Sequence, residues 1–164
     1  MPVHGRFLMR LAAVFTVTVV AMLAVSVVAL EAKLDDTEKL PSRAMEGVEE
    51  VNSENYYDVV GHDRYVLLEF YADWCGYCQD FSSMYEEYGM YVQSRPELVE
   101  RVILAKVNSP ENPRIQRRYG VRGYPTVLLV PPHSHTGVEF RRSRDFNELV
   151  DFVEKQLAMD ALKD

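Results

Sequence analysis

Two cysteines separated by two residues are the feature of this sequence best suited to chemistry. Cys75 and Cys78 are the only cysteines in 164 residues, and the single tryptophan, Trp74, directly precedes them. Residues 65–72 form a largely apolar run that predicts a buried strand, and a helical pattern follows from about residue 79. The dipole and the free N–H groups at the start of a helix favour a thiolate. This placement is what dithiol–disulfide exchange requires.

A structural disulfide and a zinc site are the alternative uses of this cysteine pair. A disulfide across so short a loop removes little entropy from the unfolded chain, so it would stabilise the fold weakly. A zinc site needs four ligands, and only His133 and His135 could complete one with the two cysteines. These histidines stand in a proline-rich stretch that predicts a solvated hairpin tip. We therefore predict a redox-active dithiol and no metal site.

The charge balance bears on the partners of the chain. The sequence holds 18 basic and 25 acidic residues, and its formal net charge is −7. Nucleic-acid binding needs clustered positive charge, so we expect no nucleic acid as a partner. Hydrophobic residues make up 48% of the chain, which is enough for a folded core, and the length suits one domain of ordinary size.

The N-terminal segment predicts export. Arg6 and Arg10 precede residues 11–30, which carry no charged side chain. Residues 1–30 are therefore predicted to be either a cleaved signal peptide or a retained membrane anchor. Both remain open because the uncharged run at residues 11–30 is longer than a usual signal core and close to the length of a membrane-spanning helix. The basic flank predicts a cytoplasmic N-terminus and an exported domain. Residues 31–46 are charged and aperiodic, and we interpret them as a linker.

The rest of the chain alternates between strand and helix patterns. Strands are predicted at residues 48–51, 65–71, 102–107, 126–130 and 138–141. Helices are predicted at residues 52–60, 76–95, 113–119 and 146–161, with a short turn or helix at 96–100. The caps of these helices are expected at Asn52 or Ser53, Asn112, Gly120 and Asp145. This alternation predicts one α/β domain over residues 47–161, in which helices cover both faces of a central sheet.

Two stretches of the sequence resemble those of a known family. Residues 68–78, Leu-Glu-Phe-Tyr-Ala-Asp-Trp-Cys-Gly-Tyr-Cys, resemble the active-site stretch of thioredoxin-fold proteins, and in particular of the catalytic domains of protein disulfide isomerases. Residues 119–126, Tyr-Gly-Val-Arg-Gly-Tyr-Pro-Thr, resemble their second signature, a loop that contains a cis-proline. The resemblance covers about residues 47–161 and implies a thioredoxin fold, with a central mixed sheet flanked by helices.

The resemblance implies a role for individual residues. Cys75 is expected to be the nucleophile and Cys78 to resolve the mixed disulfide. Glu69 matches a buried acid that moves protons to and from the second cysteine, a task for which desolvation would raise its pKa suitably. From the residues alone, Glu69 could instead be a solvated glutamate at a sheet edge. Tyr124 and Pro125 match the loop that holds an extended substrate by backbone hydrogen bonds, with Pro125 in cis.

Four further residues are expected to modulate the dithiol, namely Trp74, Gly76, Tyr77 and Arg144. Most eukaryotic disulfide isomerases have a histidine at the position of Tyr77, which stabilises the thiolate and makes the disulfide more oxidising; tyrosine has no positive form at neutral pH. The same Cys-Gly-Tyr-Cys sequence occurs in bacterial periplasmic disulfide isomerases.

Arg144 matches an arginine that members of this family move toward the second cysteine to lower its pKa. A solvated surface arginine is the alternative, since exposure is the default for this residue type. The neighbouring Arg141 and Arg142 leave the assignment within this arginine-rich stretch open.

We therefore expect a thiol–disulfide oxidoreductase or disulfide isomerase that acts on cysteine-containing protein substrates in the secretory pathway. The expected compartment is the lumen of the endoplasmic reticulum, with membrane association if residues 11–30 are retained, although residues 161–164 are not a KDEL-type signal. We expect no cofactor beyond the Cys75–Cys78 disulfide, and glutathione or a partner oxidoreductase as the electron-exchange partner. The alternatives are a membrane-tethered thiol reductase and a chaperone or interaction module with little redox turnover.

Overall fold

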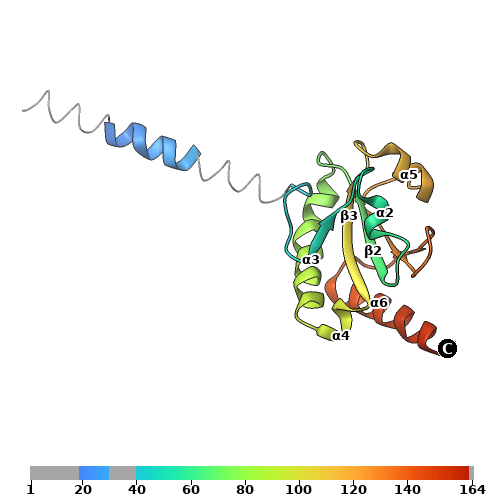
Figure 1. Cartoon of the computed structure of the whole chain (residues 1–164). Helices are drawn as coiled ribbons and strands as arrows, with labels where there is room; N and C mark the ends of the chain where they lie inside the picture. The colour runs from blue at the N-terminus through green and yellow to red at the C-terminus, as the bar shows by residue number, and fades with distance from the viewer. Residues whose placement is uncertain (1–18, 30–39, 163–164) are drawn as a thin grey trace, which may run out of the picture. The chain divides into compact units, whose positions relative to one another are not determined.

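The computed structural model describes residues 19–29 and 40–162 of the chain (Figure 1). The chain divides into two units, residues 1–38 and 39–164. Residues 19–29 of the first unit are helical and exposed. Within the described part of the chain, no helix has both the length and the apolar character that crossing a membrane demands. The predictions for residues 1–18 and 30–39 lie outside the described residues.

The second unit is built on a five-stranded mixed sheet. Its strands are β1 (Val48–Glu50), β2 (Tyr65–Tyr71), β3 (Val102–Asn108), β4 (Thr126–Val130) and β5 (Val138–Glu139). Their spatial order is β1-β3-β2-β4-β5, in which β2 and β3 are central. The β1–β3 and β2–β3 pairs are parallel, whereas β4 runs antiparallel to both β2 and β5. The predicted central strand and the predicted hairpin are both present, with β5 shorter than expected.

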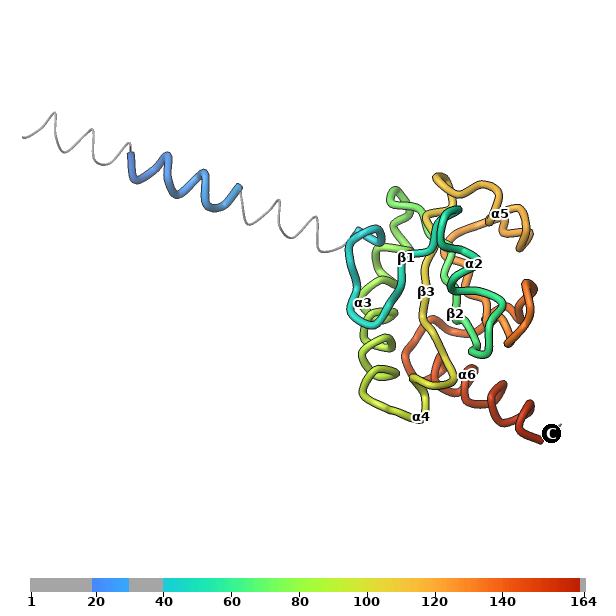
Figure 2. Tube along the Cα trace, in the orientation of Figure 1, coloured from blue at the N-terminus to red at the C-terminus, as the bar shows by residue number. Residues whose placement is uncertain are grey.

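Helices cover both faces of the sheet, as the alternating pattern predicted (Figure 2). They are α2 (Tyr56–Val59), α3 (Gly76–Gln93), α4 (Pro96–Val99), α5 (Pro113–Tyr119) and α6 (Phe146–Ala161). Leu67 and Leu104 pack on one face with buried residues of α3, α4 and α6. Leu68 and Ile103, which point the other way, pack with α2 and α5. Every residue of β2 is buried, because helices lie on both sides of it.

The helix boundaries agree with the predicted caps at Asn112, Gly120 and Asp145, although the Asn112 side chain makes no capping hydrogen bond. Asp145 caps α6 by accepting a hydrogen bond from the backbone N–H of Glu148, and Gly120 ends α5 in the left-handed conformation with φ of 65°. The prediction that Asn52 or Ser53 begins a helix is wrong. The Asn52 side chain accepts from the backbone N–H groups two and three residues later, which forms a turn, and the helix begins only at Tyr56.

Residues 40–46, assigned above to a linker, pack against the domain instead. Met45 is 6% exposed and belongs to the core that α3 and α6 cover. The Arg43 guanidinium forms an ion pair of 2.5 Å with Glu86 of α3, and the backbone N–H of Ser42 donates to Asp73 at 3.1 Å. The charged composition of this segment had indicated a solvated linker, but charged groups of the segment have partners on the domain. We call residues 40–46 the strap.

The strap crosses α3 at a glycine. A Cβ atom on Gly89 would lie 2.6 Å from the carbonyl oxygen of Glu46, which is closer than real Cβ atoms come to a backbone oxygen. The backbone N–H of Glu46 also donates to Glu86 at 2.9 Å. The missing side chain at residue 89 therefore lets the strap lie directly on the helix.

Candidate active site

The two cysteines lie at the junction of β2 with α3 and form a disulfide. Cys75 is the N-cap of α3, and its sulfur accepts a hydrogen bond of 3.2 Å from the backbone N–H of Cys78. Cys75 is 7% exposed and Cys78 is 0% exposed. An N–H group that points at the Cys75 sulfur favours the thiolate of this residue once the disulfide opens, because it stabilises negative charge there.

Aromatic side chains flank the disulfide. Trp74 and Tyr77 are 75% and 73% exposed, so neither ring is held in the core. The Trp74 ring meets the Tyr124 ring edge to face, with 5.8 Å between the ring centroids. Gly76 has no heavy atom within 4 Å of the position that its Cβ would take. The surface around the cysteines is therefore open and partly apolar.

The cis-proline loop lies against the cysteines. The Tyr124–Pro125 peptide bond is cis, which confirms the prediction for this bond. Tyr124 packs against the buried cluster that contains Cys75 and Cys78. A groove of about 690 Å³ follows this loop and is lined by residues 119–126 together with side chains that include Arg144. An extended peptide in this groove would lie along the backbone of the loop, whose Tyr124 also packs against the cysteine cluster.

Of the three neighbouring arginines, Arg144 is the one that forms a hydrogen bond to the loop. Its guanidinium donates to the carbonyl oxygen of Pro125 at 3.2 Å. Arg141 pairs with Glu139 at 2.8 Å and Arg142 pairs with Glu148 at 3.1 Å, both at the surface. The structure thus distinguishes Arg144 from its neighbours, which the sequence left open.

Glu69 is fully buried, which excludes a solvated glutamate at a sheet edge. It is 0% exposed, and neither of its carboxylate oxygens has a hydrogen-bond partner among the described residues. Burial raises the pKa of Glu69 to about 8; the charges of Lys106 and Arg144 lower it, and that of Glu50 raises it further. A carboxyl group with such a pKa takes up and releases a proton near neutral pH.

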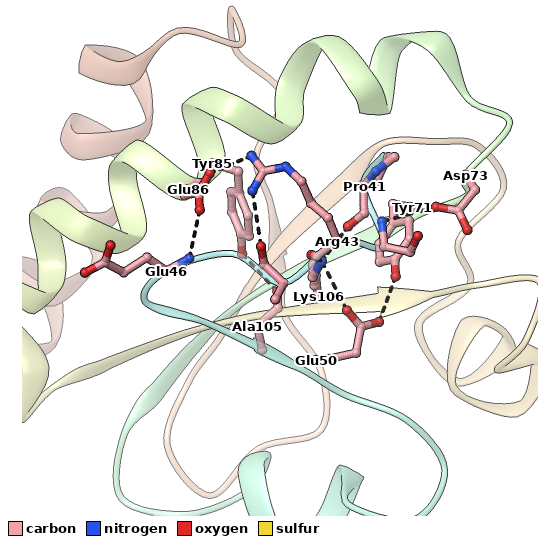
Figure 3. Close-up of polar contacts among 12 residues, drawn as sticks. Pro41, Arg43, Glu46, Glu50, Tyr71, Asp73, Tyr85, Glu86, Ala105 and Lys106 are labelled. Atoms are coloured by element: carbon pink, nitrogen blue, oxygen red, sulfur yellow. Dashed lines mark hydrogen bonds and ion pairs between the residues drawn. The ribbon is translucent and has the colours of Figure 1, made fainter. Parts of the chain in front are cut away.

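A buried lysine on β3 is part of the site and was missed in the sequence. Lys106 is 1% exposed and is paired in register with Glu69 of β2. Its ammonium donates to the carbonyl oxygens of Pro41 and Arg43 in the strap and lies 3.2 Å from the Glu50 carboxylate of β1 (Figure 3). A single lysine within an otherwise apolar strand was the available signal, because such a charge is costly without partners.

Glu50 links this lysine to the cysteine cluster. The Tyr71 hydroxyl donates to the Glu50 carboxylate at 2.8 Å (Figure 3), and the Tyr71 side chain packs with Cys75 and Cys78. The Glu50 side chain is 43% exposed, so this network reaches solvent at β1. Burial raises the pKa of the Glu50 carboxyl group, whereas Lys106 and the hydrogen bond from Tyr71 lower it.

The two histidines have separate partners. His133 lies 3.3 Å from Asp63, and the Nδ1 atom of His135 lies 3.1 Å from the Tyr56 hydroxyl. Within residues 19–29 and 40–162, no group of three or more metal-binding side chains is present.

A mixed sheet between two helical layers, a Cys-x-x-Cys disulfide that begins a helix and a cis-proline loop beside it define a protein of the thioredoxin fold. The thioredoxin family model matches residues 47–155, and the chain belongs to this family.

Several relatives of known kind are similar to the chain. It is 35% identical over 103 residues to the probable protein disulfide-isomerase A6 of Medicago sativa, which covers 63% of the chain and 27% of that protein. The structure resembles the first thioredoxin domain of mouse protein disulfide-isomerase A4, with a TM-score of 0.60, 28% identity and coverage of 69% and 77% of the respective chains. It also resembles human ERp44, with a TM-score of 0.62, 25% identity and coverage of 70% and 30%. The chain spans about a quarter of the length of the curated relatives that it matches.

Proposed function

We propose that this protein is a thiol–disulfide oxidoreductase of the disulfide-isomerase type that acts on cysteines of protein substrates. The observation that carries the proposal is the Cys75–Cys78 disulfide at the N-terminus of α3, packed against the cis-Pro125 loop. The similarity to protein disulfide-isomerases supports it.

The two cysteines of the protein supply both sulfur nucleophiles of the reaction. In the reducing direction, the Cys75 thiolate attacks one sulfur of a substrate disulfide, which forms a Cys75–substrate disulfide and releases the other substrate sulfur as a thiolate. The Cys78 thiolate then attacks Cys75, which restores the Cys75–Cys78 disulfide and releases the second substrate thiolate. Two electrons pass from the dithiol to the substrate, and the reverse sequence oxidises a substrate dithiol.

Glu69 carries the proton that Cys78 must lose before it attacks. Two features support this role: the carboxyl group is buried with unoccupied oxygens, and its pKa of about 8 suits proton transfer at neutral pH. Cys78 is completely buried, so bulk water does not serve this thiol directly. Arg144, which holds the cis-proline loop, is the residue whose positive charge stabilises the Cys78 thiolate when its side chain moves.

Substrate chains bind in extended form along the cis-proline loop. The groove beside residues 119–126, and the exposed rings of Trp74 and Tyr77, support this mode of binding. No cofactor is required, and glutathione or a partner oxidoreductase returns the dithiol to its starting state.

Two assays test the proposal. Wild-type protein should reduce insulin disulfides and refold scrambled ribonuclease, and Cys75→Ala should do neither. Cys78→Ala should accumulate a mixed disulfide with substrate, seen as a reducible adduct by mass spectrometry, because the resolving thiol is missing. An inactive wild-type protein, or a Cys75→Ala variant as active as wild type, would refute the proposal.

We also propose that the protein works in the secretory pathway, in the lumen of the endoplasmic reticulum. The uncharged run at residues 11–30 behind two arginines supports export, and an oxidising compartment suits a disulfide of this kind. Mass spectrometry of the mature N-terminus tests whether residues 1–30 are removed, and alkaline extraction tests membrane association.

A reduction potential near that of thioredoxin, about −270 mV, would indicate a reductase rather than an isomerase, for which about −180 mV is typical.

A further inference from the structure

Three charged side chains form one row across the three parallel strands. In the strand pairing, Lys106 of β3 is the register partner of both Glu50 of β1 and Glu69 of β2. Side chains at paired positions of neighbouring strands lie on the same face of a sheet, so the lysine stands between two carboxyl groups. A lysine in this position has two candidates for an ion pair.

The lysine is bound on one side only. Its Nζ atom lies 3.2 Å from the Glu50 carboxylate, and it donates to the strap carbonyls of Pro41 and, at 2.5 Å, of Arg43. These three partners match the three N–H donors of an ammonium group. Glu69 receives none of them, and both of its oxygens are buried without a partner. The close-up in Figure 3 shows the Lys106 side chain among Pro41, Arg43 and Glu50.

Glu50 is itself held in place. The Tyr71 hydroxyl donates to one of its oxygens at 2.8 Å, while the other oxygen faces the ammonium. Glu50 therefore bridges a tyrosine that packs against the cysteines and a lysine that lies beside the buried acid.

We propose that Glu50 is a positioning residue for Glu69: it holds the Lys106 ammonium on the β1 side of the row and so keeps the buried Glu69 carboxyl without an ion-pair partner. This inference deepens the proposed function and rests on it for the proton-carrier role of Glu69. An acid without a cation beside it keeps its proton to higher pH, which is what a group that both gives and takes a proton at neutral pH requires.

The other charged and titratable groups around Glu69 bear on the same equilibrium. They are Lys106 on β3, Arg144 before α6, Tyr85 on α3 and Tyr71 on β2 itself. The Tyr85 hydroxyl is committed to the carbonyl oxygens of Leu67 and Ala105, and Arg144 to that of Pro125. Glu50 is the group whose removal releases a donor of Lys106.

The test is a titration of Glu69 in the oxidised protein, in which the two cysteines do not titrate. The carboxyl carbon of Glu69 is followed by NMR in protein labelled with ¹³C-glutamate and is assigned by its loss in Glu69→Gln. Its midpoint should lie near pH 8 in wild type. In Glu50→Gln it should fall by about one pH unit or more, because a repelling charge is gone and the ammonium is free to approach Glu69.

The matched control is Glu49→Gln. Glu49 is the exposed residue that precedes Glu50 in β1, and its side chain lies on the opposite side of the strand. The substitution therefore removes the same charge from the other face of the sheet. Its variant should keep the wild-type midpoint. If Glu50→Gln does not fold, Glu50→Thr removes the same charge, keeps a hydroxyl near Tyr71 and suits a strand. An unchanged midpoint in the Glu50 variant, or an equal fall in Glu49→Gln, would overturn the inference.

The titration uses no substrate, so it separates two failures. A protein without exchange activity but with a midpoint that depends on Glu50 would remove the proposed function and leave the charge arrangement standing. A normal activity with an unmoved midpoint would remove this inference alone. If the proposed function and this inference are both correct, the pH at which insulin reduction is half-maximal should fall in Glu50→Gln along with the Glu69 midpoint.

Discussion

Glu69 and Lys106 are register partners on adjacent parallel strands, yet the structure forms no ion pair between them. The lysine donates to the strap and to Glu50, and the glutamate stays buried with its proton at neutral pH. A carboxyl group of this kind makes the stability of the fold depend on pH.

We expect the free energy of unfolding to fall as pH rises from about 4.5 to about 8. In this window the unfolded chain has released the Glu69 proton and the folded chain still holds it, since burial raises the pKa of Glu69 to about 8 from 4.5. Stability therefore decreases with pH, by on the order of 5 kcal/mol from this group, and levels off above the folded pKa.

Glu69→Gln should remove this dependence. Urea unfolding of the oxidised proteins should give the variant a gain over wild type that grows between pH 5 and pH 8. Other groups, such as Glu86, whose pKa is lowered by its hydrogen bond to Arg43, are common to both proteins and cancel in the difference. A difference between the two proteins that is constant across this range would contradict the expectation.

The same variant should be a poor catalyst. Loss of a general acid–base group typically slows a reaction by about 10²-fold or more, so we expect this fall in insulin reduction by Glu69→Gln. The rate at which the Cys75 thiolate is alkylated in the reduced protein should differ little between Glu69→Gln and wild type, because the proposed proton transfer concerns Cys78. Equal losses in both measurements would indicate a general distortion of the site.

Arg144→Gln should lower kcat/KM in the same assay by about tenfold. Its guanidinium donates to the Pro125 carbonyl oxygen, and a hydrogen bond to a charged group contributes about 1.5–3 kcal/mol. Arg142→Gln is the control, since Arg142 pairs with Glu148 at the surface. Similar activity of the two variants would remove Arg144 from the site.

Tyr77→His should make the disulfide a stronger oxidant. Tyr77 is 73% exposed, so a histidine fits without repacking, and its positive form stabilises the neighbouring thiolate of the reduced protein. Equilibration with glutathione buffers should show a reduction potential raised by about 30 mV, which corresponds to about 1.4 kcal/mol. Tyr77→Phe, which adds no charge, should leave the potential where it is.

Met45→Ala should show that the strap belongs to the folded domain. Met45 is 6% exposed within the core, and truncation of such a side chain costs about 2–5 kcal/mol. Met90→Ala serves as the control because Met90 is 43% exposed, and surface changes stay within about 0.5 kcal/mol. A Met45→Ala variant as stable as the control would place residues 40–46 outside the domain.

Local patterns predicted most of the framework. The apolar run that became β2 and the spacing along α3 and α6 gave the elements their type, because burial on one or both faces imposes a period on the sequence. The caps at Asp145 and Gly120 were also predictable, because each cap depends only on a few adjacent residues. The turn at Asn52 was not, because the same side chain can cap a helix or close a turn.

The sequence by itself determined the dithiol, its place at a strand-to-helix junction, the α/β class and, through family resemblance, the cis-proline and the buried acid. Only the tertiary structure decided which arginine contacts Pro125, that residues 40–46 pack on the domain, and that Lys106 binds Glu50 and the strap rather than Glu69. These pairings join residues far apart in the chain, and no local pattern records them. Strand register alone places Glu50, Lys106 and Glu69 in one row, and burial then makes the choice of partner matter.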